Sequence, residues 1–600
     1  MLHELYQYAI DHELAAQPGF KPKKVKAYVS ISLDGEFLAV VPRDKDAPDV
    51  YAPDIGSAAN GTRYCNFLIE KAKIPLKIIE DESKDKNIPI KHDFFLSMLE
   101  DGGEYEPKFL VLAQALRDDG TRSQIVDELI RQKLKPADPI SFRVDGVPLE
   151  TSEAFLLWWG NYRSRFAPET SGEQVPCLIT GEPTAPLATV PKVSGLFAVG
   201  GHSSGDAFLC FDKDAFQSYG LKKSANASVS EEAMTAVNAA LTELIRKADT
   251  LGGAKMVHWY SCDVSEDPLD DLFDGFGDAE ETDAPAKNGE NKALTQARSL
   301  IAALSRGETP ILPDARYYIL PLSGAGGRMM VRGWYEGRFE TLCRNIALWF
   351  SDLRLVSRNG KGLTKPPKLS AVCVRLLKPG GDGKKVWERV DEELKSLSSR
   401  LLDAILTGTP LPDEAAVRTL RYLRSASVNQ DDKDEKKLKL ENETIAFQIL
   451  KAWLLRRQRA KGETEQMGES KSAAQSSPAY ICGAMLAVYG EIQKKSSPDV
   501  NISVVERYFG AASTTPAFVL GRLAQLSVHH LRKLDQLSLG LAVKYRKELE
   551  GLAQRMGDQD IPTTLSVEQQ AQFALGYYQQ RAALYQGGRN QEEEKEDGDQ

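Results

Sequence analysis

The sequence lacks the paired cysteines and the long hydrophobic runs that mark several common classes of protein. Its seven cysteines are too far apart to form a CxxC pair, so neither a zinc ribbon nor a disulfide scaffold is supported. No hydrophobic run approaches the roughly 18–20 residues that cross a bilayer. The first stretch, MLHELYQYAIDHELAAQPG, carries acidic residues early, which is typical of an amphipathic helix and not of a signal peptide. We therefore expect a cytoplasmic protein with reduced thiols and no membrane partner.

Motifs of the common enzyme classes are also missing. There is no GxxxxGK[ST] or GxSxG motif; His92 stands beside a single aspartate, and His529 and His530 point apart on a predicted helix. SGAGGR (323–328) lies between two predicted strands, which favours a hairpin turn over a phosphate cradle. DKDEKK (432–437) resembles a nuclease pattern only in composition. We expect a non-enzymatic chain without cofactor or metal, and the alternative is a metal-dependent nuclease with dispersed ligands.

The net charge of −9 is distributed unevenly along the chain. Eleven acidic residues and one lysine lie between Asp263 and Glu290, and six acidic residues and one lysine lie in 592–600. Without these two segments the net charge is +6, so the remaining chain is mildly basic. Such acidic runs are typical of a flexible loop and a flexible tail. The basic remainder permits a surface for a polyanion such as nucleic acid.

The order of the patterns predicts an α+β N-terminal region followed by an all-α C-terminal helical bundle, in several domains. The alternation in VKAYVSISLDGEFLAVVP predicts a hairpin with Asp34 and Gly35 at its turn. Ser230 followed by two glutamates predicts a helix start, and from about residue 385 nearly every segment is helical. The expected parts are an N-terminal α/β region (1–135), a mixed α/β core (136–380) with an acidic flexible loop (about 263–290), a helical region (381–461), a linker (462–477), a helical bundle (478–588) and an acidic disordered tail (589–600).

Basic and amide side chains gather in the segment NGTRYCNFLIEKAKIPLK, which follows a flexible turn. Basic residues on such a loop can reach phosphates, and amide groups at its tip can read base edges. The alternative is an ordinary loop and edge strand with solvated lysines. The candidate contacts in this segment are Asn60, Arg63, Asn66, Lys71, Lys73 and Lys77.

Further basic runs follow in the middle of the chain and in the bundle. The stretch LGRLAQLSVHHLRKL (520–534) places its leucines on one face of a helix and its basic residues on the opposite face. One basic face is usually a solvated surface, but several in one chain favour nucleic acid. The candidate contacts are Arg358, Lys361, Arg456, Arg457, Arg522, Arg532, Lys533, Lys544, Arg546 and Lys547.

Six stretches in order along the chain resemble the large subunit of the type I-C CRISPR Cascade complex. The signature is FDKDAFQSYGLKKSANASVS (211–230), with its AFxSYG turn and NA-containing helix start. Asp212 stands where the family commonly has asparagine, and Val190–Pro191 where it usually has a histidine before the turn. The other five stretches are CLITGEPTAPLATVPKVSG (177–195), YYILPLSGAGGRMMVRGWYEG (317–337), AILTGTPLPDEAAVRTLRYLR (404–424), SPAYICGAMLAVYGEIQ (477–493) and FALGYYQQR (573–581).

The resemblance implies a prokaryotic cytoplasmic subunit that binds DNA and does not cut it. In such complexes a guide RNA reads the target by base pairing, while protein reads a short protospacer-adjacent motif (PAM) in the duplex. This subunit would recognise the PAM, promote unwinding and R-loop formation, and hold the displaced strand. We expect PAM contacts at 60–77 and displaced-strand contacts on the basic face of the bundle. The implied partners are the guide crRNA ribonucleoprotein, the repeated backbone subunits, the crRNA-processing subunit, the small subunit, the target DNA with its displaced strand, and a recruited helicase-nuclease.

The resemblance also implies a small subunit translated from within the same gene. Met467 lies in the polar linker just before the predicted helix of SPAYICGAML. A start at Met485 would remove the first turn of that helix. We therefore predict Met467 as the internal translation start of the small-subunit-like bundle. The alternatives are a linker methionine without this role and, for the whole chain, a scaffold without DNA contact.

Overall fold

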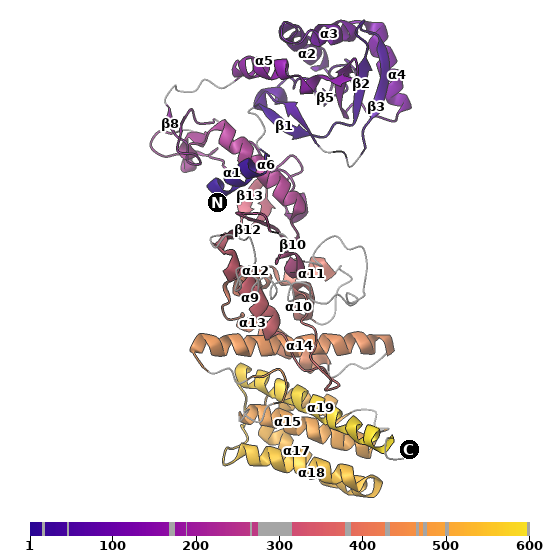
Figure 1. Ribbon diagram of the computed structural model, residues 1–600, viewed down its shortest axis with the longest axis vertical. Helices are drawn as coiled ribbons and strands as arrows, with labels where there is room; N and C mark the ends of the chain where they lie inside the picture. Colours follow the sequence, from indigo (N-terminus) through magenta and orange to yellow (C-terminus); the bar gives the residue numbers. More distant parts are fainter. Residues whose placement is uncertain are drawn as a thin grey trace. The chain divides into compact units, whose positions relative to one another are not determined.

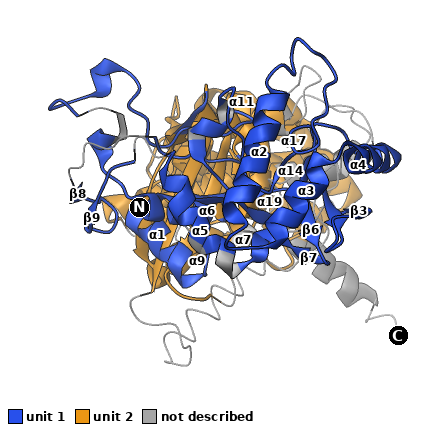
Figure 2. Cartoon of the chain, turned by 90° about the horizontal axis from the view of Figure 1, so that it is seen from above, with its two compact units in different colours: residues 1–195, 202–243, 327–329 blue, residues 196–201, 244–326, 330–600 orange. Residues whose placement is uncertain are grey.

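The computed structural model describes residues 1–14, 19–44, 47, 49–166, 174–187, 189–221, 223–264, 267–273, 315–378, 386–426, 433–463, 467–471, 477–498 and 503–596. They divide into two compact units, coloured blue and orange in Figure 2. Unit 1 holds residues 1–195, 202–243 and 327–329, and unit 2 holds residues 196–201, 244–326 and 330–600. Among the described residues no helix is long and apolar enough to cross a membrane.

The sheet of unit 1 has the strand order β3-β2-β6-β5, with β7 added to β6. β2 and β6 run parallel, and the other neighbours are antiparallel. The expected hairpin is confirmed: β2 and β3 pair, and Gly35 has a φ of +84° at the turn. The strands are β2 (Ala27–Ile31), β3 (Phe37–Pro42), β5 (Glu70–Lys71), β6 (Pro139–Val144) and β7 (Val147–Pro148).

Aromatic side chains fill the core of unit 1. The ring of Phe67 stacks on that of Trp159 at 5.7 Å between centroids and meets Phe109 edge-on at 5.4 Å. A buried carboxylate also links two strands, because Glu150 accepts hydrogen bonds from Tyr28 at 2.7 Å and from Ser141 at 2.9 Å. The remaining elements of the unit are α1 (Leu2–Asp11), β1 (Phe20–Lys23), β4 (Val50–Pro53), η1 (Gly56–Asn60), α2 (Ile88–Gly102), α3 (Lys108–Arg117), α4 (Asp119–Arg131), η2 (Leu149–Thr151), α5 (Glu153–Ser164), β8 (Val175–Pro176), β9 (Pro183–Thr184), η4 (Asp214–Phe216) and η5 (Lys223–Ala227), followed by α6 (Glu231–Lys247), whose last residues belong to unit 2.

Unit 2 begins with the short helix η3 (Phe197–Val199) and contains most of a second sheet, of order β10-β11-β12-β13 with β14 also paired to β12; residues 328 and 329 of β13 are assigned to unit 1. The stretch 323–328 turns between β12 and β13 with Gly326 and Gly327 at positive φ, so the predicted hairpin is confirmed. The first part of the expected acidic loop is folded, because Leu269, Leu272 and Phe273 are fully buried. Residues 274–290 of that loop lie outside the described residues. The elements are β10 (Thr250–Leu251), β11 (Ala254–Tyr260), α7 (Asp270–Phe273), β12 (Arg316–Ala325), β13 (Arg328–Val331) and β14 (Tyr335–Arg338).

The rest of unit 2 is helical, which confirms the predicted change from α+β to all-α. The long helix α14 lies beside a bundle formed by α15, α17, α18 and α19 (Figure 1). One continuous hydrophobic core runs from the second sheet through the middle helices into the bundle. The helices are α9 (Phe339–Asp352), α10 (Leu369–Leu376), α11 (Val386–Glu393), α12 (Lys395–Thr407), α13 (Asp413–Ala426), α14 (Lys433–Lys461), α15 (Pro478–Ser496), α16 (Val504–Ala512), α17 (Pro516–Leu537), α18 (Leu539–Met556) and α19 (Val567–Glu596).

The last helix, α19, extends to Glu596, so most of the expected disordered tail continues it. Gln, Glu and Lys have high helix propensity, which favours this extension despite the like charges. Residues 597–600 lie outside the described residues. Residues 467–471 of the expected linker are described, and they contact other residues of unit 2. Met467 is 3% exposed, and the carbonyl of Gly468 accepts from Nε2 of Gln579 at 2.9 Å.

Candidate nucleic-acid interface

The segment 60–77, predicted to contact DNA, runs through unit 1 from η1 to the edge strand β5. Asn60 ends η1, and its side chain lies outside the described residues. Nζ of Lys91 donates a hydrogen bond to the carbonyl of Ala59 at 3.1 Å, which links η1 to α2. The exposed basic side chains of the segment are Arg63, Lys71 and Lys77. Their exposure lets these three side chains reach a phosphate.

Asn66 is 8% exposed, which corrects the expectation that it lies at a loop tip. Its backbone N–H donates to Oε2 of Glu70 at 3.0 Å, and Oε1 of the same carboxylate accepts from the N–H of Lys71 at 2.9 Å. Oδ1 of Asn66 has no hydrogen-bond partner among the described residues. In this conformation Asn66 shapes the turn and does not present its amide to a base.

Lys73 is held in an ion pair within the unit. Its Nζ lies 2.7 Å from Oδ1 of Asp85, which is buried and also accepts from the backbone N–H groups of Glu80 and Asp81. The hydrogen bond from Lys73, followed by those from the backbone, holds the pKa of Asp85 below its ordinary value. Lys73 is therefore a structural residue here, whereas Lys71 and Lys77 remain candidates for phosphate contact.

Sequence reasoning missed an aromatic cluster beside Arg63. The guanidinium of Arg63 lies 5.5 Å from the ring of Tyr64, and that ring meets Phe94 at 5.0 Å and Phe166 at 5.2 Å. All three rings are half-buried. Half-exposed aromatic rings beside an arginine suit the stacking of an unpaired base. The cluster has no local signal in the sequence, because its members come from distant segments.

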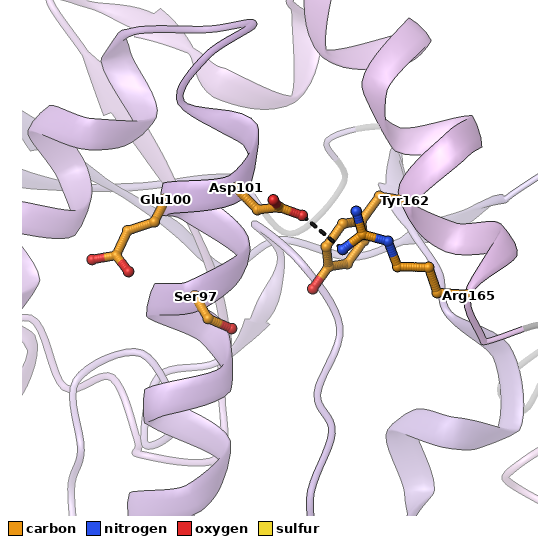
Figure 3. A pocket seen from close by; sticks show the side chains of 5 residues that line it. All are labelled: Ser97, Glu100, Asp101, Tyr162 and Arg165. Atoms are coloured by element: carbon orange, nitrogen blue, oxygen red, sulfur yellow. Dashed lines mark hydrogen bonds and ion pairs between the residues drawn. The ribbon is translucent and has the colours of Figure 1, made fainter.

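A cavity of about 430 Å³ lies near this cluster and is shown in Figure 3. Arg165 binds the carboxylate of Asp101 at 3.0 Å and lies over the ring of Tyr162 at 4.7 Å. Glu100, on the same helix as Asp101, pairs with Arg117. Both carboxylates thus have an arginine partner. Ser97 completes its lining.

The basic run of the middle region is largely engaged in ion pairs. Arg358 pairs with Glu443 at 3.1 Å, while Lys361 is exposed in the turn closed by the Val356–Leu363 bridge. Arg457 pairs with Asp413 at 3.0 Å and with Glu568 at 3.1 Å. These salt bridges join α14 to α13 and α19, so Arg457 contributes to packing between helices.

Arg456 is buried, which corrects its assignment as a nucleic-acid contact. Its side chain is completely inaccessible, and Nε lies 2.9 Å from Oδ2 of Asp352, which is itself 1% exposed. Its guanidinium also donates to the carbonyl groups of Ala404 and Thr409. Arg459 binds the same carboxylate. A charge so enclosed holds α14, α9 and α12 together and cannot reach DNA in this structure.

The exposed face of α17 best retains the predicted binding chemistry. The helix buries Leu520, Leu523 and Leu534, as its periodicity predicts. Its outward face combines exposed basic and aromatic side chains, and Phe518 near the first turn is 78% exposed. Residues at intervals of three, four and seven fall on one face of a helix. The exposed members of this α17 face are Phe518, Arg522, Gln525, His529, Arg532 and Lys533.

The charges on this face have one sign. The acidic residue of α17 is Asp535, and its carboxylate is held by Arg546 of α18 at 2.8 and 2.6 Å. This contact lowers the pKa of Asp535 and occupies Arg546. On α18, Lys547 is exposed and Lys544 is half-buried. Five of the six basic residues that were predicted to contact DNA in the bundle are therefore accessible. The sixth, Arg546, is paired with Asp535.

The groups that suit metal or acid–base chemistry are few among the described residues, and they include a histidine–carboxylate pair, in which Nε2 of His258 lies 2.8 Å from Oδ2 of Asp267. No group of three His, Cys, Asp or Glu side chains in the part of the chain that the structure describes is placed to hold a metal ion. His92 is buried, its Nδ1 lies 3.2 Å from the carbonyl of Ile74, and burial lowers its pKa. His530 contacts Ser496 at 2.9 Å and belongs to the bundle. Burial raises the pKa of the thiols of Cys343, Cys373 and Cys482 to about 12, which makes them poor nucleophiles.

Comparison with known families gives one match over nearly the whole chain. The family described as CRISPR-associated protein (Cas_Csd1) matches residues 2–585. No curated protein matches the sequence.

Proposed function

The chain belongs to the CRISPR-associated Cas_Csd1 family, the large subunits of the type I-C Cascade complex, and from this we propose that it binds target DNA at two places. The first is the PAM-containing duplex, and the second is the strand displaced by the guide RNA. The guide supplies sequence specificity by base pairing, so the protein needs only a short direct readout and contacts to the sugar–phosphate backbone. In this proposal the subunit works in the prokaryotic cytoplasm and carries out no chemistry of its own.

The α17 face is the observation that carries the displaced-strand proposal. Three exposed basic side chains, Arg522, Arg532 and Lys533, share the face with the strongly exposed ring of Phe518. Single-stranded DNA requires both features, because basic groups follow the phosphates while aromatic rings stack with bases of any sequence. The neutralised acid at Asp535 removes the repulsion that a free carboxylate would exert on a phosphate.

The proposal for duplex binding uses the accessible part of 60–77. Arg63, Lys71 and Lys77 would contact phosphates on either side of the PAM. The half-buried rings of Tyr64, Phe94 and Phe166 lie beside Arg63 and would stack on a base that leaves the duplex as it opens. Asn60 would read a base edge, since η1 is fixed by Lys91.

The further partners follow from the complex to which the family belongs. They are the guide crRNA ribonucleoprotein, the repeated backbone subunits, the crRNA-processing subunit, the small subunit and a helicase-nuclease recruited after R-loop formation. A nuclease activity of this chain itself is the competing function. It predicts that matched target DNA is cut by the purified complex when divalent metal is added without the helicase-nuclease.

The internal start at Met467 is part of the proposal. A chain beginning there keeps two contacts of the linker with the bundle, Gly468 to Gln579 and Lys471 to Glu548 at 3.0 Å. It loses the packing of Phe447 against Tyr578, whose rings lie 4.6 Å apart. A separate small subunit would therefore need another protein surface to cover that tyrosine in the assembled complex.

Charge reversal on the α17 face tests the proposed function. In the assembled complex, the triple variant Arg522→Glu, Arg532→Glu and Lys533→Glu should weaken target binding. It should also reduce the salt slope of binding by about 2, at roughly 0.7 per single-strand phosphate contact. Arg421→Glu, an exposed base on α13, is the matched control and should leave both quantities unchanged. Unchanged affinity and slope in the triple variant would instead favour a scaffold without DNA contact.

A further inference from the structure

The cavity shown in Figure 3 lies between α2 and the end of α5, and its size suits a small organic group. Its volume of about 430 Å³ falls within the range of roughly 300–1,000 Å³ that ligand pockets occupy. α2 contributes Ser97, Glu100 and Asp101, and the end of α5 contributes Tyr162 and Arg165. All five residues belong to unit 1, so the cavity is formed within one compact unit.

An aromatic ring of the cavity lies under the guanidinium group of Arg165. The guanidinium carbon is 4.7 Å from the centroid of the Tyr162 ring, and Trp158 packs against the same ring at 4.7 Å between centroids. Tyr162 is 6% exposed, whereas the side chain of Arg165 is 63% exposed. Arg165 thus occupies the place on the ring where another flat group can stack, and its exposure lets it leave that place without disturbing the core.

Asp101 holds Arg165 through an exposed ion pair. Oδ2 of Asp101 accepts from Nη1 of Arg165 at 3.0 Å, and the Asp101 side chain is 42% exposed. Glu100 points away from this pair in Figure 3 and binds Arg117. Exposed pairs contribute little to stability, so another hydrogen-bond donor can replace Arg165 on the Asp101 carboxylate.

The charges of the cavity favour a neutral ligand over a phosphate. Among the described residues, its two carboxylates are matched by the guanidinium groups of Arg165 and Arg117, so neither sign is in excess. A phosphate requires an excess of positive charge and would meet two carboxylates here. A nucleobase is neutral and flat and has hydrogen-bonding groups on its edge, so it can stack on Tyr162 while it binds Asp101.

The acceptors of the cavity favour guanine over the other bases. An ionised carboxylate only accepts hydrogen bonds, through two oxygens. Guanine has two adjacent donors on its Watson–Crick edge, N1–H and the 2-amino group, which match the two oxygens of Asp101, whereas each of the other bases has one donor group on that edge. Ser97 adds an acceptor, because its Oγ donates to the carbonyl of Phe94 at 2.8 Å and keeps its own lone pairs.

A series of aromatic rings connects Arg63 to the cavity. The guanidinium of Arg63 lies 5.5 Å from the ring of Tyr64, that ring lies 5.2 Å from Phe166, and Phe166 lies 5.7 Å from Tyr162. Arg63 is an exposed candidate for phosphate contact. A base that leaves the duplex beside Arg63 would therefore meet aromatic rings between the duplex and the cavity.

We propose that the cavity binds one guanine that has left the duplex beside the PAM. Arg165 moves off Tyr162, the guanine stacks on the uncovered ring, and Asp101 accepts hydrogen bonds from N1–H and the 2-amino group. This inference rests on the proposed binding of duplex DNA by unit 1, and it names the base that is held and the residues that hold it.

Coupling between Asp101 and guanine is the test, measured as target affinity of the assembled complex. Single positions on either side of the PAM, in both strands, are set in turn to guanine and to inosine, which lacks the 2-amino group. At one position inosine should weaken binding of the wild type by about tenfold, and Asp101→Asn should abolish this difference. Inosine also eases opening of the duplex, but it does so equally for both proteins, so comparing them removes that effect.

Two further variants separate base binding from a structural ion pair. Arg165→Ala breaks the same pair but keeps the Asp101 carboxylate, so the difference between guanine and inosine should persist. Asp119→Asn, at an exposed carboxylate that pairs with Arg122, is the matched control and should also keep it. No difference at any position, a difference that survives Asp101→Asn, or its loss in Arg165→Ala would overturn the proposal. Failure of the proposed DNA function would appear separately, as normal target affinity after charge reversal at Arg63 or on the α17 face.

Discussion

Gly483 of α15 and Gly576 of α19 each lie directly against the backbone of the other helix. A Cβ on Gly483 would overlap the carbonyl oxygen of Phe573, and a Cβ on Gly576 would overlap the carbonyl oxygen of Tyr480. The two helices therefore approach closely enough that only hydrogen fits at both positions. Both glycines fall in stretches that carry the family resemblance, which gives SPAYICGAML and FALGYYQQR a packing role.

Replacing either glycine with alanine should destabilise the bundle. Backbone atoms cannot move aside as a flexible side chain does, so Gly483→Ala should cost at least about 1–3 kcal/mol in the free energy of unfolding. Urea denaturation of the full-length chain measures this. Gly521→Ala on α17 is the control, because its new Cβ would meet nothing within 4 Å. It should be neutral or stabilising by up to about 1 kcal/mol. Equal stabilities of the two variants would contradict the close approach.

Removal of Arg456 should damage folding and not DNA binding alone. Arg456→Ala leaves the buried Asp352 without its innermost partner, which should cost about 3–5 kcal/mol in unfolding free energy. Arg532→Ala on the α17 face should change stability by no more than about 0.5 kcal/mol. Denaturation of both variants, followed by target binding of the folded fractions, checks the contrast. A stable Arg456→Ala protein with weakened DNA binding would contradict the structural role and support Arg456 as a DNA contact.

The pair Lys73–Asp85 should make stability depend on acid pH. The pKa of Asp85 is lowered from 3.8 in the folded chain by its hydrogen bond from Lys73. The stabilisation is thus fully present above pH 3.8 and is lost as the pH falls through the folded pKa. The difference in unfolding free energy between wild type and Asp85→Asn should shrink over that range. In a Lys73→Met background the shrinkage should be smaller, and an equal change in both backgrounds would exclude Lys73 as the cause.

Phe518 should contribute to single-strand binding without contributing to stability. Its ring is 78% exposed, so Phe518→Ala should leave the melting temperature unchanged. Loss of one stacked base should reduce affinity for the displaced strand by about 1–3 kcal/mol. Fluorescence anisotropy of the assembled complex with a bubble substrate measures this. Val417→Ala, at a residue of α13 that is 41% exposed, serves as control. An equal loss in both variants would argue against stacking.

Expression from the intact gene should yield a second product that begins at Met467. Mass spectrometry of the purified complex would detect it, and changing the codon to leucine should abolish it. Met467→Leu conserves the volume of a side chain that is 3% exposed, so the full-length chain should remain folded. A complex that lacks any fragment starting near Met467, or a fragment that survives the codon change, would refute the internal start.

Periodic segments were predictable because their signal is local. The β2–β3 hairpin followed from alternation and a single Asp–Gly turn, and the buried face of α17 followed from leucines spaced along one helix. Whether an individual basic residue is buried in an ion pair or exposed to solvent was not predictable in this way. Arg456 and Arg522 look alike in sequence, but the carboxylate that captures Arg456 lies 104 residues away, at Asp352.

The sequence by itself determined the family, the change from α+β to all-α, and the places where positive charge accumulates, because these depend on residue order and composition. Only the tertiary structure decided which charges face solvent. It buried Arg456, paired Lys73 with Asp85, gathered Tyr64, Phe94 and Phe166 beside Arg63, and left Phe518 and Tyr219 exposed. The physical reason is that an ion pair or an aromatic cluster depends on distances in space, which link segments far apart in the chain.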